Sequence, residues 1–358
     1  MRNDHRYSIS LFKEDGAPLG QVAAEVDFEP AEECTRFAGA RSGLLSPGEN
    51  GSDSRVEPVW NRDAGEPLMS GFRVSLTGRG RQTVSREFPL EYFTSVARRA
   101  STAFVDRGLL KAGEFFRYRV SAVPGPQRRP EAPAAFSVEE VSPALPVKAG
   151  TRLRHLMQDA EPQGAIDGDD FPVVVPRLVL DEAVELTREA GARETGGVLI
   201  GHLHQDADTP ELFLEVTAQI PARHTQSELT RLTFTADTWT TAQAAINLRR
   251  ADELMVGWWH SHSYMKETCK DCEKRREQSC KAGAAFMSGE DCLLHRTVFP
   301  RAYSVALVIS DSPCSGVSWG LFGWKRGVVA ARGFHVGSNA RHGEGRPADD
   351  EGDSHAER

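Results

Sequence analysis

The alternation of apolar and polar residues divides the chain into two patterned halves. In the first half, apolar residues at every second position predict strands, and the helical spacing of Phe93, Val96, Ala100 and Phe104 predicts an amphipathic helix over Leu90–Leu110. The expected strands are Tyr7–Phe12, Val22–Phe28, Gly71–Leu76 and Phe115–Val123. Residues 1–122 are therefore expected to form an α+β domain.

In the second half, residues 170–336, helical and strand periods follow one another more closely. Apolar residues recur at helical spacing over Asp181–Ala190 and from about Asp237 to Leu248. The expected strands are Val198–Ile200, Leu212–Ile220, Leu232–Phe234, Leu254–Trp259, Tyr303–Ile309, Val317–Phe322 and Val328–Val336. This order predicts a compact α/β domain.

Three stretches lack such a pattern. Residues 123–169 are rich in proline and are expected to form a linker between the two domains. Ser42–Ser54 is rich in Ser, Gly, Asn and Asp, which predicts a long loop. Residues 337–358 contain too few apolar side chains to fold, so we expect a disordered tail there.

Composition narrows the class of protein. The chain has 358 residues, enough for two domains, a net charge of -8 and a pI near 5.8. It shows neither a signal-peptide pattern nor an apolar run long enough to cross a bilayer, so a cytoplasmic protein is expected. The net negative charge argues against nucleic acid as a partner. The lysines and arginines of residues 270–281 do not change this, because they alternate with acids and so form a mixed charged surface.

Candidate chemistry begins at the C-terminal end of the apolar run Leu254–Trp259. His260 and His262 follow it directly. Side chains two residues apart on a strand leave the same face, so the two imidazoles can converge on one point. Ser288 and Asp291 lie three residues apart at an expected helix start, which puts both on one helical face with Ser288 near the N-cap.

Two imidazoles and one carboxylate form the ligand set of a hydrolytic zinc site. Three protein ligands leave the fourth tetrahedral position to water, whereas structural sites fill all four. Zinc lowers the pKa of bound water to about 7, which makes a hydroxide nucleophile available near neutral pH. Glu194 would then act as a base and later as an acid. Each residue alone has an ordinary structural explanation, and the order in which they occur together carries the hypothesis.

These residues resemble the motif of the JAMM (JAB/MPN) zinc metalloprotease family, and in particular its prokaryotic deubiquitinase-like members. The motif is a glutamate, then His-Ser/Thr-His, then Ser-x-x-Asp. The matching segments are Glu-Thr-Gly-Gly at Glu194, Gly-Trp-Trp-His-Ser-His ending at His262, and Ser-Gly-Glu-Asp ending at Asp291. The resemblance covers about residues 170–335.

The resemblance implies a JAB/MPN-type α-β sandwich and a role for each matching residue. His260, His262 and Asp291 would bind the catalytic zinc, Glu194 would be the general base and acid, and Ser288 would stabilise the oxyanion. The reaction implied is cleavage of a peptide or isopeptide bond at a ubiquitin-like modifier. The implied partners are that modifier, its conjugates and cognate activating or conjugating enzymes, with residues 1–122 as an adaptor for a substrate or partner.

The chain departs from the family at the segment after the second histidine. Residues 263–287 form an insertion where the family has a short connection, and Ser263 stands where a proline is common. The insertion contains Cys269, Cys272 and Cys280, and Cys292 follows shortly after it. Cys-x-x-Cys is typical of a closed structural zinc site, whose metal would supply folding free energy to a small polar segment.

Several alternatives stay open. The cysteines could form a redox pair or a cap of free thiols, or His295 could replace Cys292 as the fourth zinc ligand. The whole chain could be a non-catalytic scaffold of the same fold. The insertion could also be a zinc knuckle that recruits a protein or nucleic-acid partner.

Overall fold

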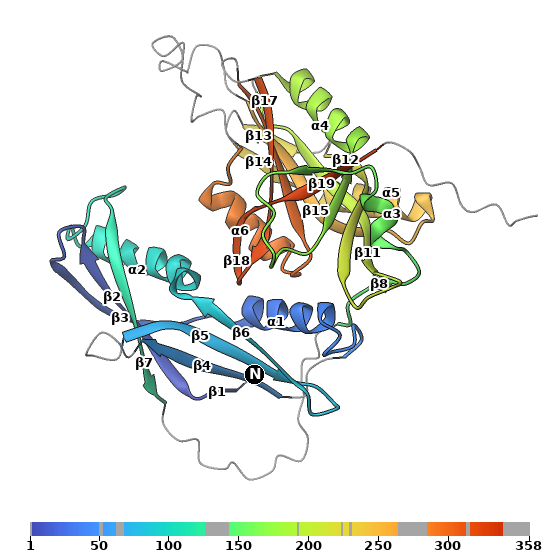
Figure 1. Cartoon of the computed structure of the whole chain (residues 1–358). Helices are drawn as coiled ribbons and strands as arrows, with labels where there is room; N and C mark the ends of the chain where they lie inside the picture. Colours follow the sequence, from blue (N-terminus) through green and yellow to red (C-terminus); the bar gives the residue numbers. More distant parts are fainter. Residues whose placement is uncertain are drawn as a thin grey trace, which may run out of the picture.

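A computed structural model describes most of the chain. The described residues are 2–49, 53–61, 68–125, 143–191, 193–222, 225–228, 231–263, 285–312 and 316–338. Within them, helices and strands mix in both halves, so the expected α/β class is confirmed (Figure 1).

A ten-stranded sheet forms the frame of the second half. Its strands lie in the order β18-β17-β16-β15-β11-β12-β10-β19-β9, and β8 pairs separately with β11. The strands are β8 (Val147–Lys148), β9 (Glu161–Gln163), β10 (Val173–Pro176), β11 (Gly196–Gln205), β12 (Leu212–Pro221), β15 (Leu254–Ser263), β16 (Val305–Ser312), β17 (Gly316–Lys325), β18 (Val328–Arg332) and β19 (Phe334–Gly337). Strand β15 lies centrally, antiparallel to β11 and parallel to β16.

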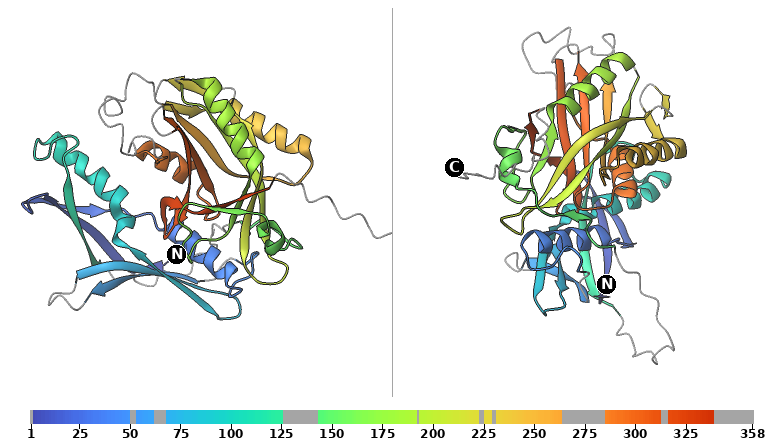
Figure 2. Two further views of the ribbon diagram at one scale, coloured as in Figure 1. Left: turned by 45° about the horizontal axis from the view of Figure 1, so that its top comes forward. Right: turned by 90° about the vertical axis from the view of Figure 1, so that its right-hand side faces the viewer.

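Helices cover both faces of this sheet (Figure 2). Helix α4 (Arg177–Ala190) packs Val179, Leu180 and Ala183 into the core on one face. On the other face, α5 (Ala236–Arg249) packs Ala242 and Ile246 against β11. The remaining elements of this half are α3 (Leu153–Met157), the hairpin β13 (Thr225–Glu228) and β14 (Arg231–Phe234), and α6 (Gly289–Val298).

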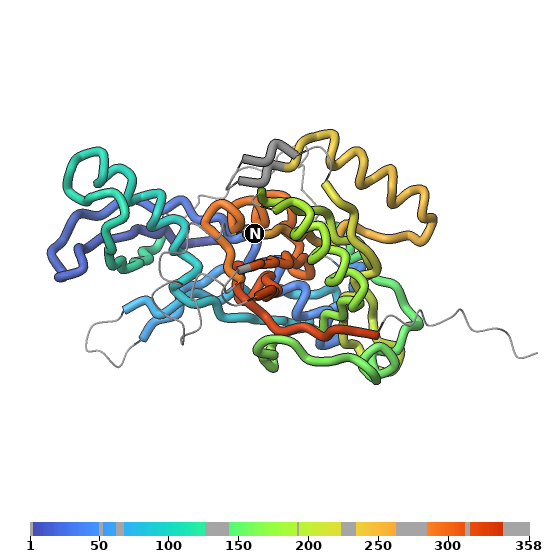
Figure 3. Tube along the Cα trace, turned by 90° about the horizontal axis from the view of Figure 1, so that it is seen from above, coloured from blue at the N-terminus to red at the C-terminus, as the bar shows by residue number. Residues whose placement is uncertain are grey.

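The first half contains two smaller sheets. One has the order β1-β4-β5-β6 and the other the order β3-β2-β7. The elements are β1 (Arg2–Asn3), β2 (His5–Lys13), β3 (Pro18–Ala24), α1 (Glu29–Arg41), β4 (Asp53–Asn61), β5 (Leu68–Thr77), β6 (Thr83–Pro89), a 3₁₀ turn at Leu90–Phe93, α2 (Thr94–Asp106) and β7 (Phe116–Pro124). Figure 3 shows α2 and α5 at opposite ends of the molecule.

Helix α1 is the main element that the pattern of apolar residues does not predict. Its buried residues include Glu33 and Arg36, which pair with each other at 3.1 Å. Glu33 also accepts from Arg301 of the second half at 3.5 Å. Because charged residues are buried on the helix, its sequence lacks a clean apolar stripe.

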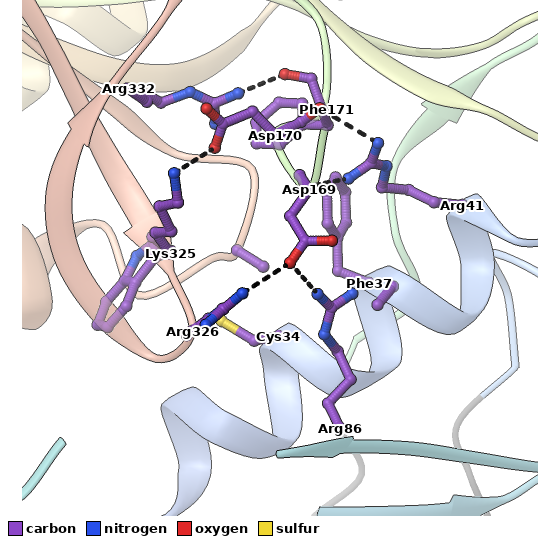
Figure 4. A pocket seen from close by; sticks show the side chains of 13 residues that line it. Cys34, Phe37, Arg41, Arg86, Asp169, Asp170, Phe171, Lys325, Arg326 and Arg332 are labelled. Carbon is purple, nitrogen blue, oxygen red and sulfur yellow. Dashed lines mark hydrogen bonds and ion pairs between the residues drawn. The ribbon is translucent and has the colours of Figure 1, made fainter. Parts of the chain in front are cut away.

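Helix α1 joins the two halves. Phe37 and Ala40 belong to the same apolar core as the inner residues of the large sheet. Beside them the Asp169 carboxylate pairs with Arg86 of β6 at 3.4 Å and with Arg326 at 3.3 Å (Figure 4). The cavity among these side chains is about 50 Å³, which has room for water and not for a larger ligand.

Two expectations are corrected by the strand pairing. Val328–Val336 is not one strand, because the chain turns at Gly333 and β18 and β19 pair at distant positions of the sheet. Residues 147–163, part of the expected linker, instead form β8, α3 and β9. Strand β8 pairs with β11, and β9 pairs with β19. Short strands of two or three residues carry too little periodicity to be recognised in a sequence.

Other expectations cannot be compared with the structure. Most of the 263–287 insertion, with Cys269, Cys272 and Cys280, lies outside the described residues, as do residues 339–358. Among the helices that the structure describes, none has the length and apolar character needed to cross a membrane.

Candidate metal centre

The two histidines stand at the C-terminal end of β15, where the sheet is fully buried. The residues His260 and His262 are 1% and 8% exposed. Close pairing with β16 fixes the strand: a Cβ atom at Gly257 would lie 2.0 Å from the carbonyl oxygen of Val305. Only glycine fits there, which explains the glycine that precedes the two tryptophans.

Asp291 is brought to the histidines by the start of α6. Ser288 is the N-cap residue, and its hydroxyl accepts from the Asp291 backbone N–H at 3.1 Å. In return, Asp291 Oδ2 accepts from the Ser288 backbone N–H at 2.7 Å. This capping box satisfies two donors of the helix end and holds the carboxylate in one orientation.

The three side chains form a compact triangle of possible metal ligands. His260 Nε2 and His262 Nε2 lie 3.0 Å apart, and Asp291 Oδ2 lies 3.5 Å from the former and 4.0 Å from the latter. The point equidistant from three atoms at these separations is about 2.1 Å from each, within the roughly 2.0–2.2 Å of zinc–nitrogen and zinc–oxygen bonds. Among the described residues this is the one group that meets a metal-binding geometry.

Electrostatics favours the protonation states that bind a metal. Burial, together with the neighbouring His260, lowers the pKa of His262 to about 4. Burial alone would raise the pKa of Asp291, but hydrogen bonds and charge from His260 and the hydrogen bonds to Ser288 hold it below its ordinary value. Near neutral pH this leaves a neutral imidazole and an ionised carboxylate, the forms required of metal ligands.

Aromatic side chains hold the imidazole rings. The Trp258 ring stacks on His260 at 4.7 Å and an angle of 13°, and Phe286 lies 4.5 Å from the His262 ring. The Nδ1 atoms of both histidines are buried without a hydrogen-bond partner in the described part of the chain. Among the described residues, packing therefore orients the rings, and none of them supplies the outer hydrogen bond common at metal sites.

Glu194 lies two residues before β11, the strand that pairs with the histidine strand β15. Strand β11 pairs Gly196 with His260. The ladder continues one residue further, because Ser261 N donates to Thr195 O at 2.8 Å and Thr195 N donates to Ser261 Oγ at 3.0 Å. This register sets Glu194 opposite His262, and opposed residues of an antiparallel pair project from the same face. Glu194 itself is half-buried.

The other candidate residues have different environments. Cys292 is partly buried in α6 and forms no disulfide with another described cysteine. Burial and the nearby Asp291 raise the pKa of its thiol. His295 is fully buried in the core, where its Nδ1 accepts from Trp258 Nε1 at 3.2 Å. Since this nitrogen already has a donor, His295 acts here as a core residue.

Sequence reasoning did not assign roles to Trp258, Phe286 and Ser261. Trp258 and Phe286 pack against the histidine rings, and Ser261 ties β15 to the segment that carries Glu194. Trp258 could have been found from the pattern, because residues two apart on a strand share a face and Trp258 precedes His260 by two. Phe286 comes from a distant segment and had no such signal.

Comparison with known proteins supports the assignment of the second half. Residues 172–277 match the family model described as JAB1/Mov34/MPN/PAD-1 ubiquitin protease. The match includes Glu194, His260 and His262 and ends before Ser288 and Asp291. The insertion separates the last two residues from the rest of the motif along the sequence, but the fold brings Asp291 back to the histidines.

Two further comparisons complete the picture. Among curated proteins, none matches this chain. The solution structure of protein DSY2949 from Desulfitobacterium hafniense is similar at 20% identity and a TM-score of 0.33, over 48% of this chain and 97% of that one. From the family match over residues 172–277, the chain carries a JAB/MPN domain in its second half.

Proposed function

We propose that this protein is a zinc-dependent hydrolase that cleaves a peptide or isopeptide bond. The triangle of His260, His262 and Asp291 carries the proposal, because its dimensions fit one zinc ion with three protein ligands. JAMM-type domains commonly bind zinc, and zinc at such a site would supply Lewis acidity that lowers the pKa of water to about 7.

Glu194 is proposed as the proton carrier. Its carboxylate takes a proton from the attacking water and delivers it to the nitrogen of the leaving amine, so one group acts first as base and then as acid. Its register opposite His262 supports this role. Ser288 is proposed to stabilise the oxyanion. Its hydroxyl lies at the N-cap of α6 beside the candidate ligand Asp291, where it could donate to a developing negative charge.

The proposed substrate is a ubiquitin-like modifier, as a precursor or as a conjugate. The support is the family description, which names a ubiquitin protease. Cognate activating and conjugating enzymes are proposed partners, and residues 1–122 are proposed to help bind a substrate or partner. A cytoplasmic location is proposed with them, since clustered cysteines suit a reducing compartment.

The mechanism predicts that two substitutions in the site have different effects. Glu194→Gln should keep its zinc and lose at least about a hundredfold in turnover, because it removes the proton carrier and leaves the ligands in place. His260→Ala should lose both zinc and activity. The measurements are metal content by mass spectrometry and cleavage of modifier fusions and conjugates. A Glu194→Gln protein with full activity would contradict the mechanism.

The same measurements separate the enzyme from a non-catalytic scaffold of the same fold. A scaffold would bind no zinc at His260 and would cleave no substrate, although it could still bind a modifier. The complete set of three ligands within bonding range of a single ion favours the enzyme. A zinc-free wild-type protein, purified without chelators and after incubation with zinc, would favour the scaffold.

A second, structural zinc is proposed at Cys269, Cys272 and Cys280, with Cys292 or His295 as the fourth ligand. The burial of His295 and its bond from Trp258 favour Cys292 for that position. We expect two zinc ions per chain in the wild type and one in Cys269→Ser, whose melting temperature should fall because metal binding contributes folding free energy. Cys34→Ser, at a cysteine far from the insertion in sequence, is the control and should keep both ions.

A further inference from the structure

One face of the first half carries three exposed arginines that form no ion pair with another described residue. In the β3-β2-β7 sheet, Ile9, Leu11 and Val120 are buried on the inner side, where α2 lies along the sheet (Figure 1). The outer side is formed by the even-numbered residues 6–12 of β2 and the odd-numbered residues 117–123 of β7. The strand register confirms this, since Ser10 pairs with Arg119 and Phe12 with Arg117.

This outer side, here called the arginine face, holds the exposed side chains of Arg6, Arg117 and Arg119. None of its residues on β2 or β7 is Asp or Glu, and β3 adds only uncharged residues such as Gln21 and Ala23. None of the three arginines forms an ion pair with another described residue. The acids next in sequence lie just past the strand ends, at Asp4 before β2, Glu14 after β2 and Glu25 after β3.

The neighbouring sheet of the same half shows the ordinary arrangement. There Arg55 pairs with Glu57 at 3.3 Å and Arg73 pairs with Glu87 at 2.5 Å, all at exposed positions. Arginines on that sheet are neutralised within the chain, whereas those of the arginine face are not. Their positive charge is therefore available to a partner, because exposed like charges steer and select an oppositely charged ligand.

The small side chains and the arginine spacing of the arginine face fit an extended peptide segment. Between the arginines lie small hydroxyl side chains such as Ser8, which accepts from Gln21 Nε2 at 2.7 Å. Arg117 and Arg119 are two residues apart on one strand, a separation of about 7 Å. Acidic residues at alternate positions of an extended peptide have the same spacing, and arginine binds carboxylates through a two-pronged guanidinium.

We propose that the arginine face is a docking surface for an extended acidic segment of a partner protein, with acids at alternate positions. A single-stranded nucleic acid fits less well. Nucleic-acid surfaces need open aromatic rings for base stacking, and the one aromatic ring here, Phe12, is already covered by the Arg119 guanidinium at 5.8 Å. The proposal does not depend on the hydrolase, because it involves no residue of the metal centre.

The test measures binding of a fluorescent peptide to the full-length protein by anisotropy. The peptide has three glutamates separated by single serines, and a second peptide of the same composition has its glutamates in one block. We expect the alternating peptide to bind more tightly, and its binding to weaken with salt. The triple variant Arg6→Ser, Arg117→Ser, Arg119→Ser should weaken binding roughly tenfold or more.

The control is the double variant Arg55→Ser, Arg73→Ser on the neighbouring sheet, which should change the affinity by less than about twofold. A charge swap distinguishes lost binding from a folding defect. Arg119→Glu should bind the glutamate peptide more weakly and should bind a peptide with lysines at the same positions, which an unfolded protein would not do. Absence of peptide binding at low salt, equal loss in both sets of variants, or tighter binding of a single-stranded oligonucleotide would each overturn the proposal.

Discussion

At the scale of the residue, Asp291 shows how one carboxylate oxygen can serve the helix and the site together. Its Oδ2 accepts from Ser288 N at 2.7 Å and also faces the Nε2 atoms of His260 and His262. The helix cap therefore fixes the ligand before any metal is bound, and pre-orientation of this kind lowers the cost of binding.

A second residue, the buried His295, makes the stability of the core beside the site depend on pH. Burial lowers its pKa to about 4, whereas an unfolded histidine titrates near 6.5. Between these values the unfolded chain binds the extra proton. The contribution of His295 is therefore fully present above about pH 6.5 and is lost as the pH falls through about 4.

We expect the free energy of unfolding to decrease between about pH 7 and about pH 5, with His295 accounting for on the order of 2 kcal/mol of the change. In His295→Gln the amide oxygen can still accept from Trp258, but no proton is taken up at this position. The variant should therefore lose less stability over the same range. Urea unfolding of both metal-free proteins measures the difference, and identical pH profiles would show that His295 does not titrate as inferred.

At the scale of the element, the turn between β17 and β18 contacts the first half of the chain. Arg326 and Gly327 both have positive φ, 48° and 73°, as in the two-residue turns that match the twist of a hairpin. A Cβ atom at Gly327 would lie 2.5 Å from Tyr92 Cε2. The glycine is needed for the turn and also for its contact with the other half.

Gly327→Ala should therefore destabilise the protein through backbone strain and a clash with Tyr92, by about 2–3 kcal/mol in total. Gly113→Ala is the matched control, because its φ is 81° and nothing lies within 4 Å of the added Cβ. It should cost about 1 kcal/mol, from the backbone alone. Denaturant unfolding measures both, and an equal loss in the two variants would refute the contribution of the contact.

At the scale of the whole molecule, α1 makes the two halves share a core. Phe37 lies 5.1 Å from the ring of Phe171 and 6.4 Å from that of Tyr303, both in the second half. The ion pairs around Asp169 surround this contact (Figure 4). Because the halves bury apolar surface against each other, we expect them to unfold together.

Phe37→Ala should remove part of this shared core and lower the stability by about 3–5 kcal/mol. Phe115→Ala, at an exposed phenylalanine, should change it by less than about 0.5 kcal/mol. Calorimetry should give one transition for the wild type, since the shared core couples the halves. Two well-separated transitions in the wild type, each unaffected by Phe37→Ala, would mean that the halves are independent.

Much of the candidate site could be predicted from the sequence, because its signals are local. The spacing of His260 and His262 on a strand fixes a common face, and the Ser288–Asp291 pair is the signature of a helix cap. The strand and helix patterns of the second half were also readable wherever a segment was long and periodic. Residue type and spacing thus determined the chemistry of the donors and the class of the fold.

Only the tertiary structure decided which distant segments meet. Strand pairing brings the segment that follows Glu194 alongside the histidines, and packing brings Asp291 within 4.0 Å of both histidines. It also placed α1, with its buried Glu33 and Arg36, between the halves. These outcomes depend on contacts between residues far apart in the chain. Such contacts stabilise the fold without producing a periodic pattern of apolar residues in the local sequence.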